Sequence, residues 1–125
     1  MASTVLIVDD SATMRSALKA YLRAPELSLA EAESGERALA LVRLLRPAVA
    51  LVDLQLPGMS GLELLARLRE EGLAQELAVL LVTGEDGAEW AEKSAAAGAR
   101  GLIRKPVDPV ALKARVLELL PGRTP

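Results

Sequence analysis

Short apolar segments alternate with helical patterns five times along this chain of 125 residues. The apolar segments are residues 4–8, 27–32, 48–52, 78–82 and 101–103. Three of them are continuous apolar runs bounded by polar or turn residues, which is typical of parallel strands covered on both faces. Repeated strand–helix units require right-handed crossovers and leave helices on both sides of the sheet. The sequence therefore predicts an α/β fold with a doubly wound, five-stranded parallel sheet and five helices.

Capping and helix-breaking residues set the limits of the expected helices. They are Ser11, Pro47, Ser60, Gly72, Gly98, Asp108 and Pro109. Apolar residues at helical spacing should face the sheet. In the first, second and fifth helices these are Met14, Leu18, Tyr21 and Leu22, then Ala38, Leu41, Val42 and Leu45, then Leu112, Val116 and Leu119. The second apolar segment is the most polar of the five, so we expect it at an edge of the sheet.

Composition excludes several classes of function. Apolar residues make up 51% of the chain and charged residues 26%, which is typical of a globular protein. The chain has no cysteine and no histidine, which excludes disulfides, zinc sites built on those residues and Ser–His chemistry. A net charge of −2 and an aromatic content of 2% argue against a nucleic-acid partner. With no evident signal peptide and no apolar run of about 20 residues, we expect a cytoplasmic protein without membrane contact.

Polar side chains gather where the predicted strands end. Asp9 and Asp10 follow the first strand, Asp53 the third, Thr83 the fourth, and Lys105 comes shortly after the fifth. The carboxyl ends of parallel strands meet at one edge of the sheet, and ligands bind there, where the strand order reverses. We therefore expect three carboxylates, one hydroxyl and one ammonium group to converge at this edge.

Three neighbouring carboxylates repel one another unless a cation lies between them. Oxygen ligands that leave room for water suit Mg²⁺, so the cluster predicts a magnesium site. A carboxylate beside Mg²⁺, an ammonium and a hydroxyl is well placed to attack a phosphoryl group, because positive charge neutralises the transferred oxygens. In this interpretation Asp53 is the nucleophile and becomes an aspartyl phosphate, while Thr83 donates to a phosphoryl oxygen.

Four motifs at the predicted strand ends resemble the receiver domain of two-component response regulators. They are VDD at 8–10, VDLQLPGMSGLELL at 52–65, TG at 83–84 and KP at 105–106. The resemblance extends from about Thr4 to about Leu120 and is greatest to the chemotaxis-type single-domain receivers. It implies a flavodoxin-like fold with strand order 2-1-3-4-5 and a single receiver domain over residues 1–125.

The resemblance also implies how the phosphoryl group is handled. Asp53 would be the phosphoacceptor, and its donor would be the phosphohistidine of a sensor histidine kinase or of a histidine phosphotransfer protein. Thr83 and Lys105 would contact the phosphoryl oxygens, and the Lys105–Pro106 peptide bond would be cis. Such a domain is not an enzyme in the usual sense, although it promotes its own phosphorylation and dephosphorylation.

The metal ligands and the tuning residues follow from the same resemblance. Asp10 would bind Mg²⁺ directly together with Asp53, Asp9 would bind it through water or position it, and Gln55 would offer its backbone carbonyl. Gln55 and Glu85, each two positions past a site residue, match family positions that tune how fast the phosphoryl group is lost.

Two departures from the family lie at positions expected to couple phosphorylation to a change in the output surface. Leu102 stands where the family usually has Tyr or Phe, and Val107 stands where an aromatic residue often follows the KP pair. In the family, the aromatic ring at this position swings inward when the threonine moves toward the phosphoryl group. Leucine fills less volume than that ring. The output surface implied by the family is the fourth helix, fifth strand and fifth helix, with Trp90 as a candidate anchor for an output protein. The domain would be a monomer or a phosphorylation-dependent dimer.

Other functions remain open from the residues alone. The chain is alternatively a receiver domain excised from a DNA-binding regulator, in which the same surface would form a dimer. A phosphorylation-independent interaction module is a further alternative, favoured by Leu102 and opposed by the intact acidic and basic residues. A small hydrolase with Asp53 as nucleophile lacks a general base, because the chain has no histidine.

Overall fold

The computed structural model describes residues 2–84 and 88–122. Within these residues strands and helices alternate in the predicted order, and each strand lies within one residue of its predicted limits. The strands are β1 (Ser3–Val8), β2 (Leu27–Ala32), β3 (Val49–Asp53), β4 (Ala78–Thr83) and β5 (Gly101–Arg104). The helices are α1 (Ala12–Tyr21), α2 (Gly35–Leu45), α3 (Gly61–Glu70), α4 (Ala88–Ala96) and α5 (Pro109–Glu118).

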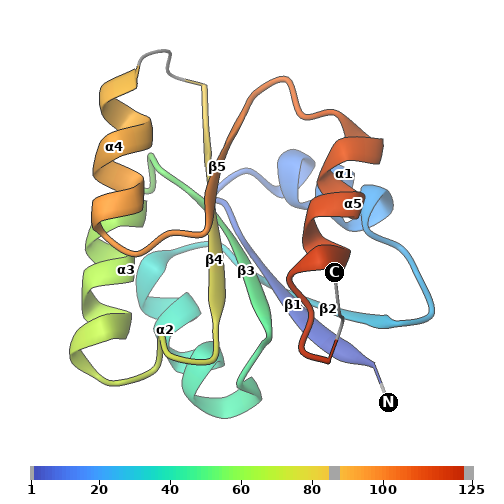
Figure 1. Cartoon of the computed structure of the whole chain (residues 1–125), viewed down its shortest axis with the longest axis horizontal. Coiled ribbons are helices and arrows are strands. Elements are labelled where there is room, and N and C mark those ends of the chain that lie inside the picture. The colour runs from blue at the N-terminus through green and yellow to red at the C-terminus, as the bar shows by residue number, and fades with distance from the viewer. Residues whose placement is uncertain (1, 85–87, 123–125) are drawn as a thin grey trace.

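All neighbouring strands pair in parallel in the order β2-β1-β3-β4-β5 (Figure 1). This confirms the doubly wound, flavodoxin-like fold, with the polar second strand at an edge as expected. The chain moves to one side of β1 to form β2 and to the other side to form β3, β4 and β5. The strand order therefore reverses between β1 and β3, and their carboxyl ends flank the switch point.

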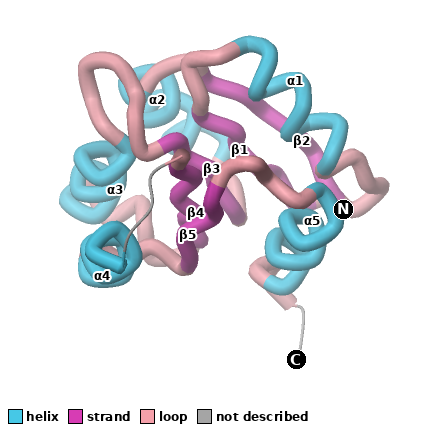
Figure 2. Tube along the Cα trace, turned by 90° about the horizontal axis from the view of Figure 1, so that it is seen from above, coloured by secondary structure: helices cyan, strands magenta, loops and turns pink. Residues whose placement is uncertain are grey.

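Helices cover both faces of the sheet, with α1 and α5 on one face and α2, α3 and α4 on the other (Figures 1 and 2). Each face has its own buried cluster. In β4, Leu80 belongs to the cluster under α1 and α5, and Leu81 belongs to the cluster under α2 and α3; both are 0% exposed. Burying one leucine stabilises the fold by about 1.5–3 kcal/mol. Burial on both faces explains why the central strands are continuous apolar runs.

Polar side chains cap the first turns of four helices. The capping residues are Ser11, Ser34, Ser60 and Asp108, each of which accepts a backbone N–H. At α3 the cap is reciprocal, because the Glu63 side chain accepts from Ser60 N at 3.2 Å. α2 ends at Leu45 because Pro47 cannot continue a helix, and Arg46 between them has a left-handed φ of 47°.

The predicted inner face of α2 is wrong at one position. Leu45 is 40% exposed, whereas Leu39, which the prediction omits, is 4% exposed. Gly35 turns this side of the helix inward, since a Cβ there would lie 2.8 Å from Met59 Sδ. The buried stripe is consequently rotated relative to the predicted one, and Leu45 falls at its margin in the last turn.

The described helices are short. The longest, α2, has 11 residues. In residues 2–84 and 88–122, no helix has the length and apolar character that crossing a membrane requires.

Candidate functional site

The carboxyl ends of β1, β3 and β4 bring the predicted polar residues together. Asp53 and Thr83 are the last residues of β3 and β4, and Asp9 directly follows β1. The N–H of Leu54 donates to a β4 carbonyl at 2.8 Å, which joins the ends of these two strands. Lys105 N donates to Thr83 O at 2.8 Å, so the residue that follows β5 is fixed at the same edge.

Three carboxylates meet at this edge. One carboxylate oxygen from each of Asp9, Asp10 and Asp53 lies within 4.8 Å of the other two. Asp9 and Asp53 are 2% and 7% exposed, whereas Asp10 is exposed. Hard divalent cations take oxygen ligands of this kind, and an exposed side leaves room for the waters that Mg²⁺ retains. The donor set therefore fits a magnesium ion.

Burial raises the pKa of the Asp9 carboxyl above its ordinary value of 3.8, and the neighbouring Asp53 carboxylate raises it further. Two contacts act in the opposite direction. Ser11 N donates to Asp9 Oδ1 at 2.9 Å, and Lys105 Nζ lies 4.0 Å from Asp9 Oδ2. Because the pKa is raised despite these contacts, a further positive charge at the cluster would stabilise the ionised carboxylate.

Lys105 reaches the cluster from the loop after β5. Its Nζ lies 3.3 Å from Asp53 Oδ2, within hydrogen-bond and ion-pair distance, and its side chain is 29% exposed. The Lys105–Pro106 peptide bond is cis, as the resemblance implies. Asp53 is thus held between one ammonium group and two other carboxylates.

The loop after β3 is built around Asp53. Gln55 N donates to Asp53 Oδ1 at 2.9 Å and so orients the carboxylate. Gly61 N donates to Leu54 O at 3.0 Å. A Cβ on Gly61 would lie 2.6 Å from Asp53 O, so no side chain fits between α3 and the end of β3. Sequence analysis did not identify Gly61 as a site residue, although its place directly after the Ser60 cap was visible.

Arg15 is a second residue that sequence analysis missed. Its Nη1 donates to Asp9 O at 2.7 Å, and its Nε donates to Glu31 Oε1 at 2.8 Å. The only signal in the sequence is a basic residue shortly after the paired aspartates. Its partner Glu31 lies 16 positions away, so the contact depends on the pairing of β1 with β2.

The predicted switch residues lie on the β5 side of the sheet. Leu102 is opposite Leu81 in the β4–β5 register, is half-buried, and packs with Trp90 against the cluster under α2 and α3. Val107 packs against the opposite cluster. Glu85, predicted to tune the lifetime of the phosphoryl group, lies outside the described residues.

The chain matches the family model of the response regulator receiver domain over residues 5–117. The match spans nearly the whole chain, and the fold has the strand order of that family. The protein therefore belongs to the receiver domains of two-component response regulators. Receiver domains of this family interact with histidine kinases and with output proteins.

Individual relatives agree with this assignment. The chain is 38% identical over 120 residues to a cyclic di-GMP phosphodiesterase of Thermotoga maritima, with 96% of this chain and 32% of the relative covered. It is 34% identical over 109 residues to the nitrate/nitrite response regulator protein NarL of Escherichia coli K12, with 86% and 50% covered. The chemotaxis protein CheY4 of Vibrio cholerae superposes with a TM-score of 0.88 at 28% identity, with 96% of this chain and 100% of CheY4 covered. The chain spans half or less of the two curated relatives.

Proposed function

We propose that Asp53 accepts a phosphoryl group from a phosphohistidine and that the modified domain then changes its protein contacts. The observation that carries this proposal is the buried Asp53 carboxylate, held 3.3 Å from the Lys105 ammonium and beside two further carboxylates. Phosphoryl transfer depends mainly on positioning and on positive charge at the phosphoryl oxygens. A fixed nucleophile with one ammonium and a set of metal-binding oxygens around it meets both needs.

In the proposed transfer a carboxylate oxygen of Asp53 forms the new bond to phosphorus. The bond from phosphorus to the donor imidazole nitrogen breaks, and its electron pair returns to that nitrogen. These 125 residues contain no histidine, so the donor imidazole would lie outside them, on a sensor histidine kinase or a histidine phosphotransfer protein. Lys105 would contact one phosphoryl oxygen and Thr83 would donate to another.

Asp9, Asp10 and Asp53, with the backbone carbonyl of Gln55, are the proposed Mg²⁺ ligands. Asp10 would bind the ion directly, while Asp9 would bind it through water or position it. The clustering of the carboxylates and the raised pKa of Asp9 support this assignment. When bound, Mg²⁺ supplies positive charge to the phosphoryl oxygens.

The domain is proposed to act on itself and not on free substrates. It would promote its own phosphorylation and its own dephosphorylation. The proposed determinants of the phosphoryl lifetime are Glu85 and Gln55, the second of which is exposed next to Asp53.

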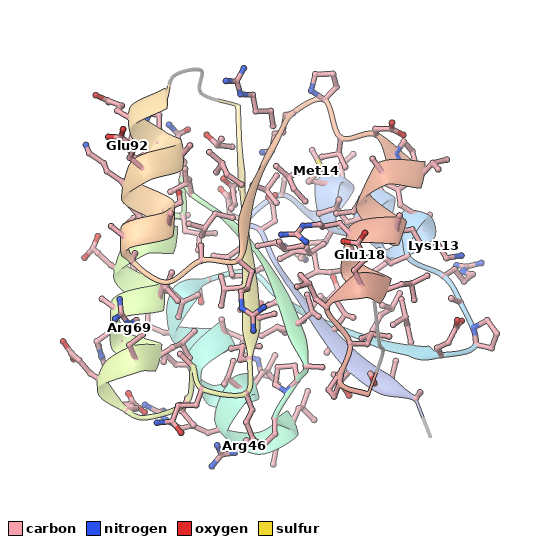
Figure 3. The ribbon with its side chains drawn as sticks, in the orientation of Figure 1. Met14, Arg46, Arg69, Glu92, Lys113 and Glu118 are labelled. Carbon is pink, nitrogen blue, oxygen red and sulfur yellow. The ribbon has the colours of Figure 1, made fainter. Side chains whose placement is uncertain are left out.

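The proposed output surface consists of α4, β5 and α5. β5 is an edge strand whose residues are half-buried or exposed, and Trp90 is half-buried on α4. Glu92 is exposed on α4 (Figure 3), whereas Lys113 of α5 points toward the end of α1, where its Nζ donates to Arg23 O at 2.9 Å. An output protein would bind here, with the domain a monomer or a phosphorylation-dependent dimer.

Two observations favour alternative candidates. Leu102 in place of an aromatic residue favours an interaction module that works without phosphorylation. The partial coverage of the relatives favours a receiver domain of a longer regulator, because the chain spans 50% of a nitrate/nitrite response regulator. The excised receiver of a DNA-binding regulator is one form of this candidate.

Intact-mass spectrometry tests the proposal. The protein is incubated with phosphoramidate and Mg²⁺, with Asp53→Asn in parallel and with a chelator as the metal control. We expect one added phosphoryl group on the wild type only, and none when Mg²⁺ is removed. Failure to gain it from phosphoramidate and from a phosphorylated histidine domain alike would favour the phosphorylation-independent module.

A further inference from the structure

Arg15 connects the acidic cluster to the edge of the sheet. It lies near the start of α1, and its side chain is 16% exposed. Nη1 donates to the backbone oxygen of Asp9 at 2.7 Å, and Nε donates to Glu31 Oε1 at 2.8 Å. Hydrogen bonds from a charged group are stronger than neutral ones, and the rigid guanidinium fixes the directions of both.

The contact with Asp9 fixes more than one residue. The carbonyl of Asp9 and the N–H of Asp10 belong to one planar peptide group. A guanidinium held on this carbonyl therefore sets the orientation of the whole peptide group between the two acidic residues. Asp9 is also fixed on its other side, because its N–H donates to Ala32 O at 3.1 Å and its Oδ1 accepts from Ser11 N at 2.9 Å.

Glu31 holds Arg15 in place from β2. Its Oε2 accepts from Lys19 Nζ at 2.6 Å while its Oε1 accepts from Arg15. In the sheet register Glu31 lies opposite Ile7, two residues before Asp9. A continuous series of contacts thus runs from β2 through α1 to the backbone of the metal-binding loop.

We propose that Arg15 is a positioning residue of the metal site, which orients the carboxylates of Asp9 and Asp10 by holding the peptide group between them. This inference rests on the proposed function, because it requires the acidic cluster to bind Mg²⁺. Arg15 does not serve as a ligand, since its guanidinium is a cation. It acts through the backbone of Asp9.

Whether the loss of Arg15 weakens or strengthens Mg²⁺ binding distinguishes a positioning role from simple charge repulsion. Arg15 carries a positive charge near the cluster, so its removal would strengthen Mg²⁺ binding if charge repulsion alone mattered. Positioning predicts weaker binding, because groups that orient metal ligands typically contribute about 10–100-fold to affinity. Lys19→Gln is the matched control: it removes one positive charge and one contact with Glu31 but leaves the contact with Asp9 intact.

The experiment is a calorimetric titration of Mg²⁺ into the wild type, Arg15→Gln, Arg15→Lys and Lys19→Gln, each first shown to be folded by circular dichroism. We expect about tenfold weaker binding for Arg15→Gln. We expect a smaller loss for Arg15→Lys, whose ammonium can still reach Asp9 O but cannot bridge to Glu31 in the same geometry. Lys19→Gln should stay within about twofold of the wild type.

The possible outcomes differ for the two proposals. If the wild type binds Mg²⁺ and Arg15→Gln binds it equally or more tightly, the positioning role is overturned and the proposed function stands. Equal losses of Mg²⁺ affinity in Arg15→Gln and Lys19→Gln also overturn the positioning role. If Arg15→Gln does not fold, Arg15→Lys provides the test. A Mg²⁺ affinity of Arg15→Lys equal to that of the wild type then overturns the positioning role. A wild type that does not bind Mg²⁺ overturns both proposals.

Discussion

At the scale of single residues, Asp9 shows how a buried carboxyl beside a second carboxylate lowers the stability of the fold at neutral pH. Its carboxyl is buried beside Asp53, and its pKa is raised by that burial first and by the neighbouring carboxylate second. The folded state therefore binds the Asp9 proton more tightly than the unfolded state does. It follows that the stability contributed by this group is present at low pH and is lost as the pH rises from 3.8 through the raised pKa.

Asp9→Asn should consequently raise the free energy of unfolding at pH 7 in the absence of Mg²⁺, by on the order of 1 kcal/mol. The amide oxygen can still accept from Ser11 N, while the buried charge is removed. The difference should disappear at about pH 3, where Asp9 is protonated in both states. Urea denaturation at the two pH values measures both effects. Added Mg²⁺ should stabilise the wild type more than the variant, which keeps Asp10 and Asp53. A variant less stable than the metal-free wild type at pH 7 would contradict this explanation.

At the scale of elements, the site depends on how closely α3 approaches β3. Gly61→Ala places a Cβ 2.6 Å from Asp53 O, a backbone atom that cannot move without shifting the strand end. We expect a loss of about 1–3 kcal/mol in the free energy of unfolding. Gly84→Ala is the control, since a Cβ there meets nothing within 4 Å, and it should change stability by less than about 0.5 kcal/mol. Similar denaturation midpoints for both variants would show that the helix adjusts freely.

Glu31 on β2 forms ion pairs with Arg15 and Lys19 on α1. Its contribution to the free energy of unfolding should depend on pH. Hydrogen bonds from Lys19 and then from Arg15 lower the pKa of Glu31 below its ordinary value of 4.5. The resulting stabilisation is present above pH 4.5 and is lost as the pH falls through the lowered pKa. Because the Glu31 side chain is 40% exposed, Glu31→Gln should lose only about 0.2–1 kcal/mol at pH 7.

Thermal unfolding of Glu31→Gln and the wild type across pH and salt measures this contribution. The difference in Tm between the two proteins should become smaller in acid. It should also become smaller in about 1 M salt, which screens exposed charges. A difference that grows as the pH falls from 7 to about 3 would have the wrong sign for a carboxylate with a lowered pKa.

The limits of a strand or helix were predictable where the residues of that segment alone determine them. The apolar runs locate every strand to within one residue. For the central strands β1, β3 and β4 the physical reason is burial on both faces of the sheet. The face of α2 was less predictable, since its buried side includes Gly35, where a Cβ would lie 2.8 Å from Met59 Sδ, and leaves Leu45 exposed. The strand order came from the family resemblance, because apolar runs alone do not specify how the crossovers are arranged.

At the scale of the whole molecule, the sheet assembles a site from residues that are distant in the chain. Lys105 contacts Asp53 across 52 positions. Such a set was predictable because each member stands at the end of a strand. Arg15 was not, since its two partners become neighbours only when β1 pairs with β2. Arg69, labelled on α3 in Figure 3, donates from Nη1 to the backbone oxygen of Ala97, the residue that follows α4, at 2.7 Å.

The most direct test of the proposed site is a crystal structure of the protein with Mg²⁺ and beryllofluoride, whose tetrahedral fluoride group stands in for the phosphoryl group. We expect beryllium on a carboxylate oxygen of Asp53, the fluorides in contact with Thr83 and Lys105, and Mg²⁺ on Asp10, Asp53 and the carbonyl of Gln55. Asp53→Asn under the same conditions should bind no beryllofluoride. Binding of beryllofluoride to a residue other than Asp53, or a metal ion bound away from the three carboxylates, would contradict the assignment of this edge of the sheet as the phosphoacceptor site.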